Sequence, residues 1–364
     1  MMVKYALVFL LLCASLTPGA QEDAWKKIVP PLEFSFPRDH GSHPDYRTEW
    51  WYFTGQLETP TGRQFGYQFT IFRVGLIPGG PQADDPPMRP RQLLAGHFAV
   101  ADIQKQQFKF AERFRRIGAG FADASQEEMR AWIGDWQIIR NDGDEVAISA
   151  QDREKAIGIE FSLTPMKSLV YQESGGYSKK GSESGNASAY LSWTRMTTDG
   201  VLTLDGIEYP VRGFSWFDHE WGSSQLGEGV EGWDWLGLHL DDGRDLMIYG
   251  LRRGDGEFIP ESGGTLVDSD GTAHALARDD FTMRPLNTWR SPVTNADYPI
   301  EWEIAIPKAD IAFQIKPLLL NAELNANQSL GVTYWEGPVE MVGKTTGRGY
   351  MELSGYATNL ENKF

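Results

Sequence analysis

The stretch Tyr67-Gln68-Phe69-Thr70-Ile71-Phe72-Arg73-Val74 alternates apolar and polar side chains over most of its length. Successive side chains of a strand point to opposite faces, so a period of two is typical of a β-strand with one buried face. The same pattern recurs at residues 95–100, 246–251, 298–306 and 349–354. The sequence therefore predicts a mostly β protein.

One helix is predicted among these strands. Ser125 and Glu128 are spaced as a capping box, and Met129, Trp132 and Ile133 form an apolar stripe that follows it. Two segments between strands, 78–91 and 174–188, are rich in Gly, Ser, Pro and charged residues and predict loops. Each loop is either a lid over a cavity or a plain flexible surface segment.

A faint internal repeat divides the chain. The segment from Trp50 through Gly62 to a strand ending at Arg73 parallels the segment from Trp233 through Gly243 to a strand ending at Arg252. Aligning the two glycines pairs Leu57 with Leu238 and leaves the two arginines slightly out of step. Self-similarity at this spacing implies two related domains, which we place at residues 35–210 and 211–364. Closed barrels suit such domains, because closure removes exposed strand edges and leaves a lumen.

The first twenty residues read as a secretory signal. Lys4 supplies a positive charge, residues 6–12 an apolar run and residues 17–20 a small-residue exit. Residues 21–34 are then a linker, and the protein is expected to be secreted or periplasmic. Cleavage near Ala20 removes Cys13, the single cysteine, so no disulfide is expected in the mature chain.

The formal net charge of −16 makes nucleic acid and anionic membranes poor partners. No apolar run after the leader has the length of a transmembrane helix.

The run Asp218-His219-Glu220-Trp221-Gly222 places three ionisable groups next to an indole, directly after residues 213–217. If the run is extended, His219 and Trp221 share one face, and Asp218 and Glu220 share the other. The histidine then either acts on a ligand as a base or belongs to a buried network between the domains.

Asp218 and Glu220 are the candidate general acids of this run. Burial among aromatic rings would keep a carboxyl group protonated near neutral pH, as acid catalysis requires. The alternative is a carboxylate that is ion-paired with an arginine such as Arg212 or Arg244.

Aromatic residues cluster around the candidate acids and at a second place upstream. We predict that they line one apolar cavity for a substrate, and that their electron-rich faces stabilise a developing cation. The set is Trp50, Trp51, Tyr52, His97, Trp216, Trp221, Trp233, Trp235 and Tyr249. Close to the upstream cluster, Asp45, Arg47 and Glu49 predict an ion-pair network rather than a catalytic group.

Motifs for cofactors and metals are weak. The histidines lack the spacing of a zincin, and no Gly-rich phosphate loop or dinucleotide fingerprint follows a strand. Ser215 lacks the second glycine of a serine-hydrolase elbow. We therefore expect no cofactor and no catalytic metal.

Several longer motifs resemble the CrtC/AttH family, whose secreted branch is called "predicted secreted hydrolase". They occur in order along nearly all of the chain after the leader: residues 45–52, 66–69, 97–98, 216–221, 232–235, 334–337 and 347–353. The resemblance implies two tandem lipocalin-like (calycin) antiparallel β-barrels. It also implies an activity like that of carotenoid 1,2-hydratase, which adds water to a terminal double bond.

These observations lead to three hypotheses. The first is a cofactor-free hydratase or hydrolase acting on a lipid, isoprenoid or carotenoid-like molecule near the domain junction. Asp218 or Glu220 would then donate the proton and His219 would orient or deprotonate the water. The second is a periplasmic lipid carrier that serves an ABC transporter, a partner implied by the resemblance. The third is a scaffold for partner binding.

Overall fold

The computed structural model describes residues 25–80, 90–118, 120–224 and 226–361. The expected leader at residues 1–20 lies outside this part, as does most of the predicted loop at 78–91. None of the helices in the described ranges is long and apolar enough to span a membrane.

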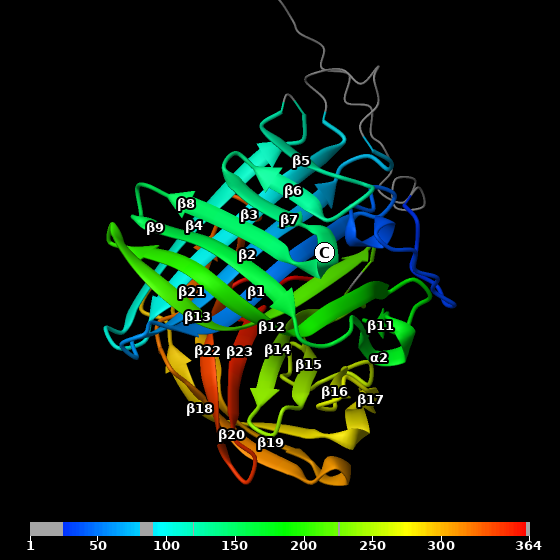
Figure 1. Ribbon diagram of the computed structural model, residues 1–364. Coiled ribbons are helices and arrows are strands. Elements are labelled where there is room, and N and C mark those ends of the chain that lie inside the picture. The colour runs from blue at the N-terminus through cyan, green and yellow to red at the C-terminus, as the bar shows by residue number, and fades with distance from the viewer. Residues whose placement is uncertain (1–24, 81–89, 119, 225, 362–364) are drawn as a thin grey trace, which may run out of the picture.

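The chain forms two antiparallel sheets in tandem (Figure 1). In spatial order, the first sheet consists of β4 (Gln107–Arg116), β3 (Gln92–Asp102), β2 (Gln64–Gly75), β1 (Thr48–Glu58), β13 (Ile207–Gly222), β12 (Ala187–Leu204), β9 (Ile157–Pro165), β8 (Val146–Asp152), β7 (Trp136–Arg140), β6 (Arg130–Ile133) and β5 (Ala122–Ala124). Two short strands, β10 (Val170–Tyr171) and β11 (Tyr177–Lys179), pair with β12.

The second sheet follows the first along the chain. Its spatial order is β17 (Ala273–Ala277), β16 (Gly263–Val267), β15 (Asp245–Arg253), β14 (Val230–Leu240), β23 (Gly347–Ser354), β22 (Val332–Gly343), β20 (Ile311–Pro317), β19 (Asp297–Ile306) and β18 (Thr282–Arg290), with β21 (Glu323–Ala326) on β22. The helical elements among the described residues are single turns: η1 (Arg38–His40), η2 (Asp142–Asp144), α2 (Gln172–Gly175), η3 (Arg278–Asp280) and η4 (Pro307–Ala309).

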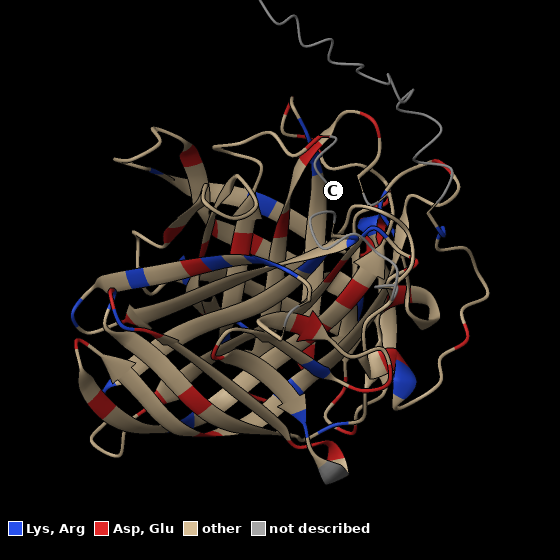
Figure 2. Ribbon diagram, turned by 90° about the horizontal axis from the view of Figure 1, so that it is seen from above, with Lys and Arg blue, Asp and Glu red and all other residues tan. Residues whose placement is uncertain are grey.

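The first sheet curls into a nearly closed barrel, and the second forms a half-barrel beneath it in Figure 1. The barrel is filled by its own side chains, among them the buried residues Phe53, Phe69 and Trp136. Charged residues of both signs are interspersed along the strands and loops (Figure 2). The prediction of a mostly β protein with two tandem barrel domains is confirmed, and all five predicted strands are present.

The predicted helix near Ser125 is wrong, because this region is a turn followed by strand β6. Met129, Ala131 and Ile133 are buried, whereas Arg130 between them is exposed. This period of two satisfies the barrel core, and pairing of β6 with β5 and β7 satisfies its backbone. The apparent helical stripe arises because Met129 and Ile133 are four residues apart. This spacing puts them on one side of a helix and also on one face of a strand.

The internal repeat corresponds to two equivalent hairpins. Strands β1 and β2 turn at Gly62, and β14 and β15 turn at Gly243, where φ is +83° and +90° respectively. These backbone conformations favour glycine. The paired residues Leu57 and Leu238 are both buried. Strand β13 belongs to the first sheet, which therefore continues to Gly222, past the division placed at residue 210.

A buried ionic cluster joins the two sheets at Asp245 of β15. Its carboxylate accepts hydrogen bonds from Thr194 Oγ1 at 2.9 Å and Arg195 Nε at 2.8 Å, both on β12 of the first sheet. Lys167 Nζ lies 2.7 Å from the same carboxylate, whose side chain is 0% exposed. Asp245 thus neutralises two cations at the junction.

We predict that Asp245→Ala lowers the free energy of unfolding by about 3–5 kcal/mol, because it leaves buried cations unpaired. Asp297→Ala is the matched control, since Asp297 pairs with Arg290 on the surface and should change stability by at most about 1 kcal/mol. Urea unfolding measures both. Equal effects of the two substitutions would contradict this role of Asp245.

Candidate active site

Strand β13 presents its polar residues to two different environments. Trp50 and Tyr52 of β1 pair in register with Glu220 and Asp218, so these four side chains lie on one face of the sheet. His219 lies on the opposite face. The alternation that the sequence predicts for an extended run is present, and it separates His219 from the two carboxyl groups.

A cavity of about 100 Å³ lies between the outer face of the first sheet and the second sheet. The first sheet contributes residues of β1, β2, β12 and β13, and the second contributes residues of β14, β15, β22 and β23. The lining residues are Trp50, Tyr52, Gln68, Thr70, Phe72, Lys180, Tyr190, Asp218, Glu220, Leu226, Trp233, Trp235, Tyr249, Leu251, Leu330, Val332, Thr333, Tyr334, Glu336, Glu352, Ser354 and Leu360.

Glu336 of β22 is the least satisfied carboxyl group of this cavity. Its Oε1 accepts a hydrogen bond from Tyr52 Oη at 2.5 Å, across the junction of the sheets. Its Oε2 is buried and has no hydrogen-bond partner. Burial raises the pKa of Glu336 well above its usual range, and the nearby Glu352 raises it further. Both effects favour the protonated form of Glu336.

Glu352 of β23 is the cross-strand neighbour of Glu336. Opposed residues of neighbouring strands have their Cβ atoms about 4.5–5.5 Å apart, so the two carboxyl groups share one part of the cavity wall. Glu352 accepts hydrogen bonds from Trp233 Nε1 at 3.0 Å and Ser354 Oγ at 2.6 Å. Burial raises the pKa of Glu352 to about 7 despite these donors. The pair therefore combines an acid with a group that ionises near neutrality.

Asp218 faces them from the first sheet. It accepts hydrogen bonds from Tyr190 Oη at 2.7 Å, Ser192 Oγ at 2.5 Å and Trp216 Nε1 at 2.7 Å. Burial raises the pKa of Asp218 to about 7, and the three donors oppose this rise. Trp235 Nε1 donates to Tyr190 Oη at 3.0 Å, which extends the network along the wall.

Glu220 is held as an ion pair, and its partner is Lys180 rather than Arg212 or Arg244. Lys180 Nζ lies 3.0 Å from Glu220 Oε1, and Ser188 Oγ donates to the same oxygen. The ammonium group also lies over the ring of Tyr249, 4.4 Å from its centroid. Lys180 comes from the predicted loop at 174–188, which brings a buried cation into the cavity wall.

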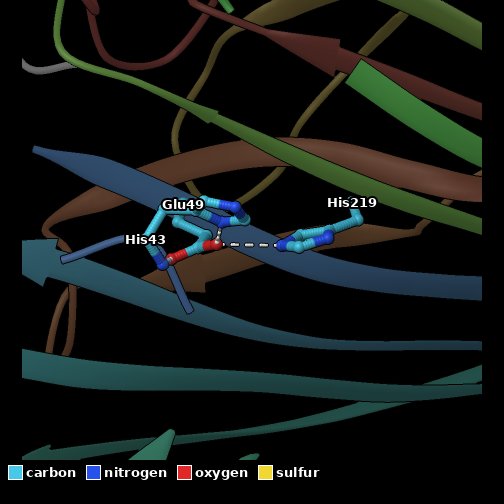
Figure 3. A group of neighbouring side chains, drawn as sticks. All are labelled: His43, Glu49 and His219. Atoms are coloured by element: carbon cyan, nitrogen blue, oxygen red, sulfur yellow. Dashed lines mark hydrogen bonds and ion pairs between the residues drawn. The ribbon is translucent and has the colours of Figure 1, made fainter. Parts of the chain in front are cut away.

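The opposite face of β13 carries a buried network centred on Glu49 (Figure 3). Glu49 Oε1 lies 2.7 Å from His43 Nδ1 and 2.9 Å from His219 Nε2. Glu49 Oε2 accepts hydrogen bonds from Arg73 Nε at 2.7 Å and from the His43 backbone N–H at 2.9 Å. The predicted ion-pair network is therefore present at Glu49, with Arg73 rather than Arg47 as the cation.

His43, Glu49 and His219 also lie close enough together to hold a metal ion. A cation there would have to replace the two imidazole N–H protons that point at Glu49, beside a guanidinium already paired with it. His43 Nε2 lies 3.2 Å from Asp39 Oδ1, so both ring nitrogens of His43 already contact a carboxylate oxygen. The four donors on Glu49 fit a hydrogen-bonded anchor for β1, β2 and β13.

The predicted site residues thus divide among four places. Trp50, Tyr52, Asp218, Glu220, Trp233, Trp235 and Tyr249 line the cavity. Trp216 and His97 lie beside the cavity on the same face of the first sheet, where they contact Asp218 and Tyr334. Trp51 and His219 lie on the inner face of the barrel sheet, and Trp221 lines a second hollow of about 410 Å³ under the segment 26–45.

The carboxyl groups Glu336 and Glu352 were not among the predicted site residues. Both lie within late motifs, residues 334–337 and 347–353, that carry the family resemblance. A signal was therefore present, but only the pairing of β22 with β23 shows that the two glutamates face the same cavity.

Comparison with known proteins shows which family and which solved structures this chain resembles. The AttH-like family model matches residues 27–356. The crystal structure of an AttH-type protein from Nitrosomonas europaea, solved at 2.00 Å, superposes with a TM-score of 0.82 at 33% identity, covering 91% of this chain and 99% of that one. Kievitone hydratase from Nectria haematococca superposes with a TM-score of 0.67 at 14% identity, covering 92% and 97%. The latter likeness concerns the fold alone.

Two curated relatives are enzymes that add or remove water. The chain is 23% identical to dehydratase asqC of Emericella nidulans over 60% of its own length and 62% of that protein. It is 26% identical to kievitone hydratase of Fusarium solani subsp. phaseoli over 42% of each chain. The match thus spans less than two thirds of either relative. Because the family model covers nearly the whole described chain, the protein belongs to the AttH-like family, as its motifs predict.

Proposed function

We propose that this protein is a hydratase or dehydratase that acts on a small apolar molecule in the cavity between the two sheets. The observation that carries the proposal is Glu336, a buried carboxyl group with one unpartnered oxygen on the wall of an aromatic cavity. Addition and removal of water share one transition state, so one acid and one base serve both directions. The dehydratase and hydratase relatives support this reaction class.

The cavity offers groups for each step of such a reaction. For hydration, Glu336 donates its proton to an alkene carbon, and the faces of Trp233 and Trp235 stabilise the cation that develops. Glu352, as carboxylate, takes a proton from the water whose oxygen bonds to the cation. One proton leaves Glu336 and one arrives on Glu352, so water is added with no other reactant. Dehydration is the reverse sequence.

We assign the role of general acid to Glu336, and not to Asp218 or Glu220, which are the candidates that the sequence suggests. Glu220 is already committed to Lys180, and Asp218 accepts three hydrogen bonds that favour its ionised form. His219 orients Glu49 rather than a water in the cavity. Asp218 with Tyr190 remains a second proton-exchanging pair on the facing wall.

The volume of the cavity, about 100 Å³, limits the ligand. An engineered cavity of about 150 Å³ binds benzene, so this smaller cavity suits a group no larger than one ring, such as the branched end of an isoprenoid. This favours an enzyme that handles one end of its substrate over a carrier that encloses a whole lipid. Export to the periplasm or outside the cell is part of the proposal and rests on the leader-like residues 1–20.

We predict that Glu336→Gln lowers the rate of water addition or removal by about 10²–10⁴-fold, because the amide cannot donate a proton as an acid does. The assay incubates the protein with a panel of small terminal alkenes, prenylated phenols and tertiary alcohols in oxygen-18 water. Mass spectrometry then detects gain or loss of one labelled water. Glu340→Gln is the matched control, because Glu340 is exposed on the same strand.

A Glu336→Gln variant that turns over a panel compound at the wild-type rate would refute the acid role of Glu336. Esters of the same alcohols are added to the panel, and their cleavage in place of water addition would instead identify a hydrolase.

The titration of Glu352 predicts how stability depends on pH. Its pKa rises from 4.5 to about 7 on folding, so between these values the folded state binds more protons than the unfolded state. Stability from this group is therefore complete below about pH 4.5 and is lost as the pH rises through about 7. Since each pKa unit corresponds to about 1.4 kcal/mol, the loss is about 3 kcal/mol.

The measurement is urea unfolding of the wild type and of Glu352→Gln at about pH 5 and about pH 8. The wild type should lose more stability than the variant over this range. An identical pH dependence of the two proteins would mean that Glu352 does not titrate near neutrality.

A further inference from the structure

A row of polar residues crosses the first sheet from an edge strand to the cavity. Cross-strand pairing aligns Glu112 of β4 with His97 of β3, and His97 with Thr70 of β2. Thr70 in turn pairs with Tyr52, and Tyr52 with Asp218. Residues in register share a face, so this row lies on the outer face that the second sheet covers. Such a buried polar row requires partners for its groups.

Residues from the second sheet connect the outer end of this row to the cavity. Tyr334 Oη, on the cavity wall, lies 2.7 Å from His97 Nδ1. His97 Nε2 lies 2.9 Å from Ser329 Oγ, and Ser329 Oγ lies 2.5 Å from Glu112 Oε2. Four side chains thus form an unbroken chain of hydrogen bonds from the cavity to the half-buried Glu112 on an edge strand.

The chemistry of the groups fixes the direction of every bond in the chain. A carboxylate only accepts, so Ser329 donates its proton to Glu112 and accepts the N–H of His97 Nε2. Burial lowers the pKa of His97 to about 3, so the imidazole is neutral and its Nδ1 carries a lone pair. Tyr334 therefore donates to Nδ1. All protons point from the cavity towards Glu112.

We propose that Tyr334, His97, Ser329 and Glu112 form a proton relay that connects the cavity with solvent. A proton that arrives on Tyr334 Oη displaces the phenolic proton to His97 Nδ1. The imidazole passes its Nε2 proton to Ser329, and the serine passes its own proton to Glu112, which releases it to water. Each hop breaks one O–H or N–H bond and forms another, so only the orientation of the chain changes.

This inference rests on the proposed function and adds a role to it. Glu352 gains a proton in each hydration and Glu336 loses one, so both must be reset before the next turnover. Tyr334 and Glu336 lie two residues apart on β22 and therefore on one face of it. The outward hops remove the proton that Glu352 gains and reverse every hydrogen bond of the chain. The next passage then carries a proton inward, to the side of the cavity where Glu336 must be reloaded.

Exchange of the Glu336 proton tests the relay without knowledge of the substrate. The C=O band of a protonated carboxyl group shifts in the infrared when its proton is replaced by deuterium, and Glu336→Gln identifies the band by removing it. The wild-type protein, Glu112→Gln and Ser329→Ala are transferred from H₂O to D₂O, and the rate of the shift is recorded. His274→Gln is the control, because His274 is an exposed histidine paired with Asp268.

The relay predicts that Glu112→Gln and Ser329→Ala slow the exchange by at least about tenfold, a threshold below the roughly 10²–10⁴-fold that positioned proton-transfer groups supply. His274→Gln should leave the rate unchanged. Glu112→Gln keeps the size of the side chain and one of its two acceptor oxygens. It therefore serves as a second variant in case Ser329→Ala misfolds. Equal rates in all proteins would overturn the relay alone. Absence of a Glu336 band from the wild type would overturn the proposed function and the relay together.

Discussion

Strand β13 is buried on both faces from Ser215 to Gly222, and the rest of the structure is arranged around this constraint. A strand in this position cannot leave a polar side chain without a partner. On the barrel side, His219 bonds to Glu49, which ties β13 to β1 and β2. On the other side, Asp218 and Glu220 bond to β12 and the segment that follows α2. One strand thus joins a filled barrel to a cavity.

Two buried glutamates show how the surroundings of a carboxyl group decide its use. Burial by itself raises the pKa of Glu49, but Arg73 and His43 outweigh it and hold that pKa well below the usual range. Glu336 is equally buried but has only the hydroxyl of Tyr52 as a partner, so its pKa lies well above the usual range of a glutamate. The first group is a fixed anion that anchors strands. The second has surroundings that favour its protonated form, as general-acid catalysis requires.

Local patterns in the sequence predict the strands and the paired hairpins, because side-chain periodicity and turn glycines are local properties. The helix predicted near Ser125 fails for a related reason: Met129 and Ile133 fit a helical stripe, and only the barrel core selects the strand. The alternation of Asp218 and His219 is also local, and it correctly separates their faces.

The acid pair of the cavity depends on contacts between distant segments. Glu336 meets Tyr52 across 284 positions of sequence, and Lys180 reaches Glu220 from a segment with the composition of a loop. A lone glutamate in a strand has no feature that distinguishes a buried acid from a solvated one. The family motifs around Glu336 and Glu352 draw attention to these two residues. Their burial, and hence their raised pKa values, follows only from the packing of one sheet against the other.

The central claim is that chemistry takes place between the sheets, at Glu336. The most direct test is a crystal structure of the Glu336→Gln variant bound to a panel compound that the wild-type protein hydrates or dehydrates. The account predicts density in the cavity, with the reacting carbon or oxygen within hydrogen-bond reach of residue 336 and beneath Trp233 and Trp235. Density inside the barrel beside His219, or in the hollow beside Trp221, would contradict it.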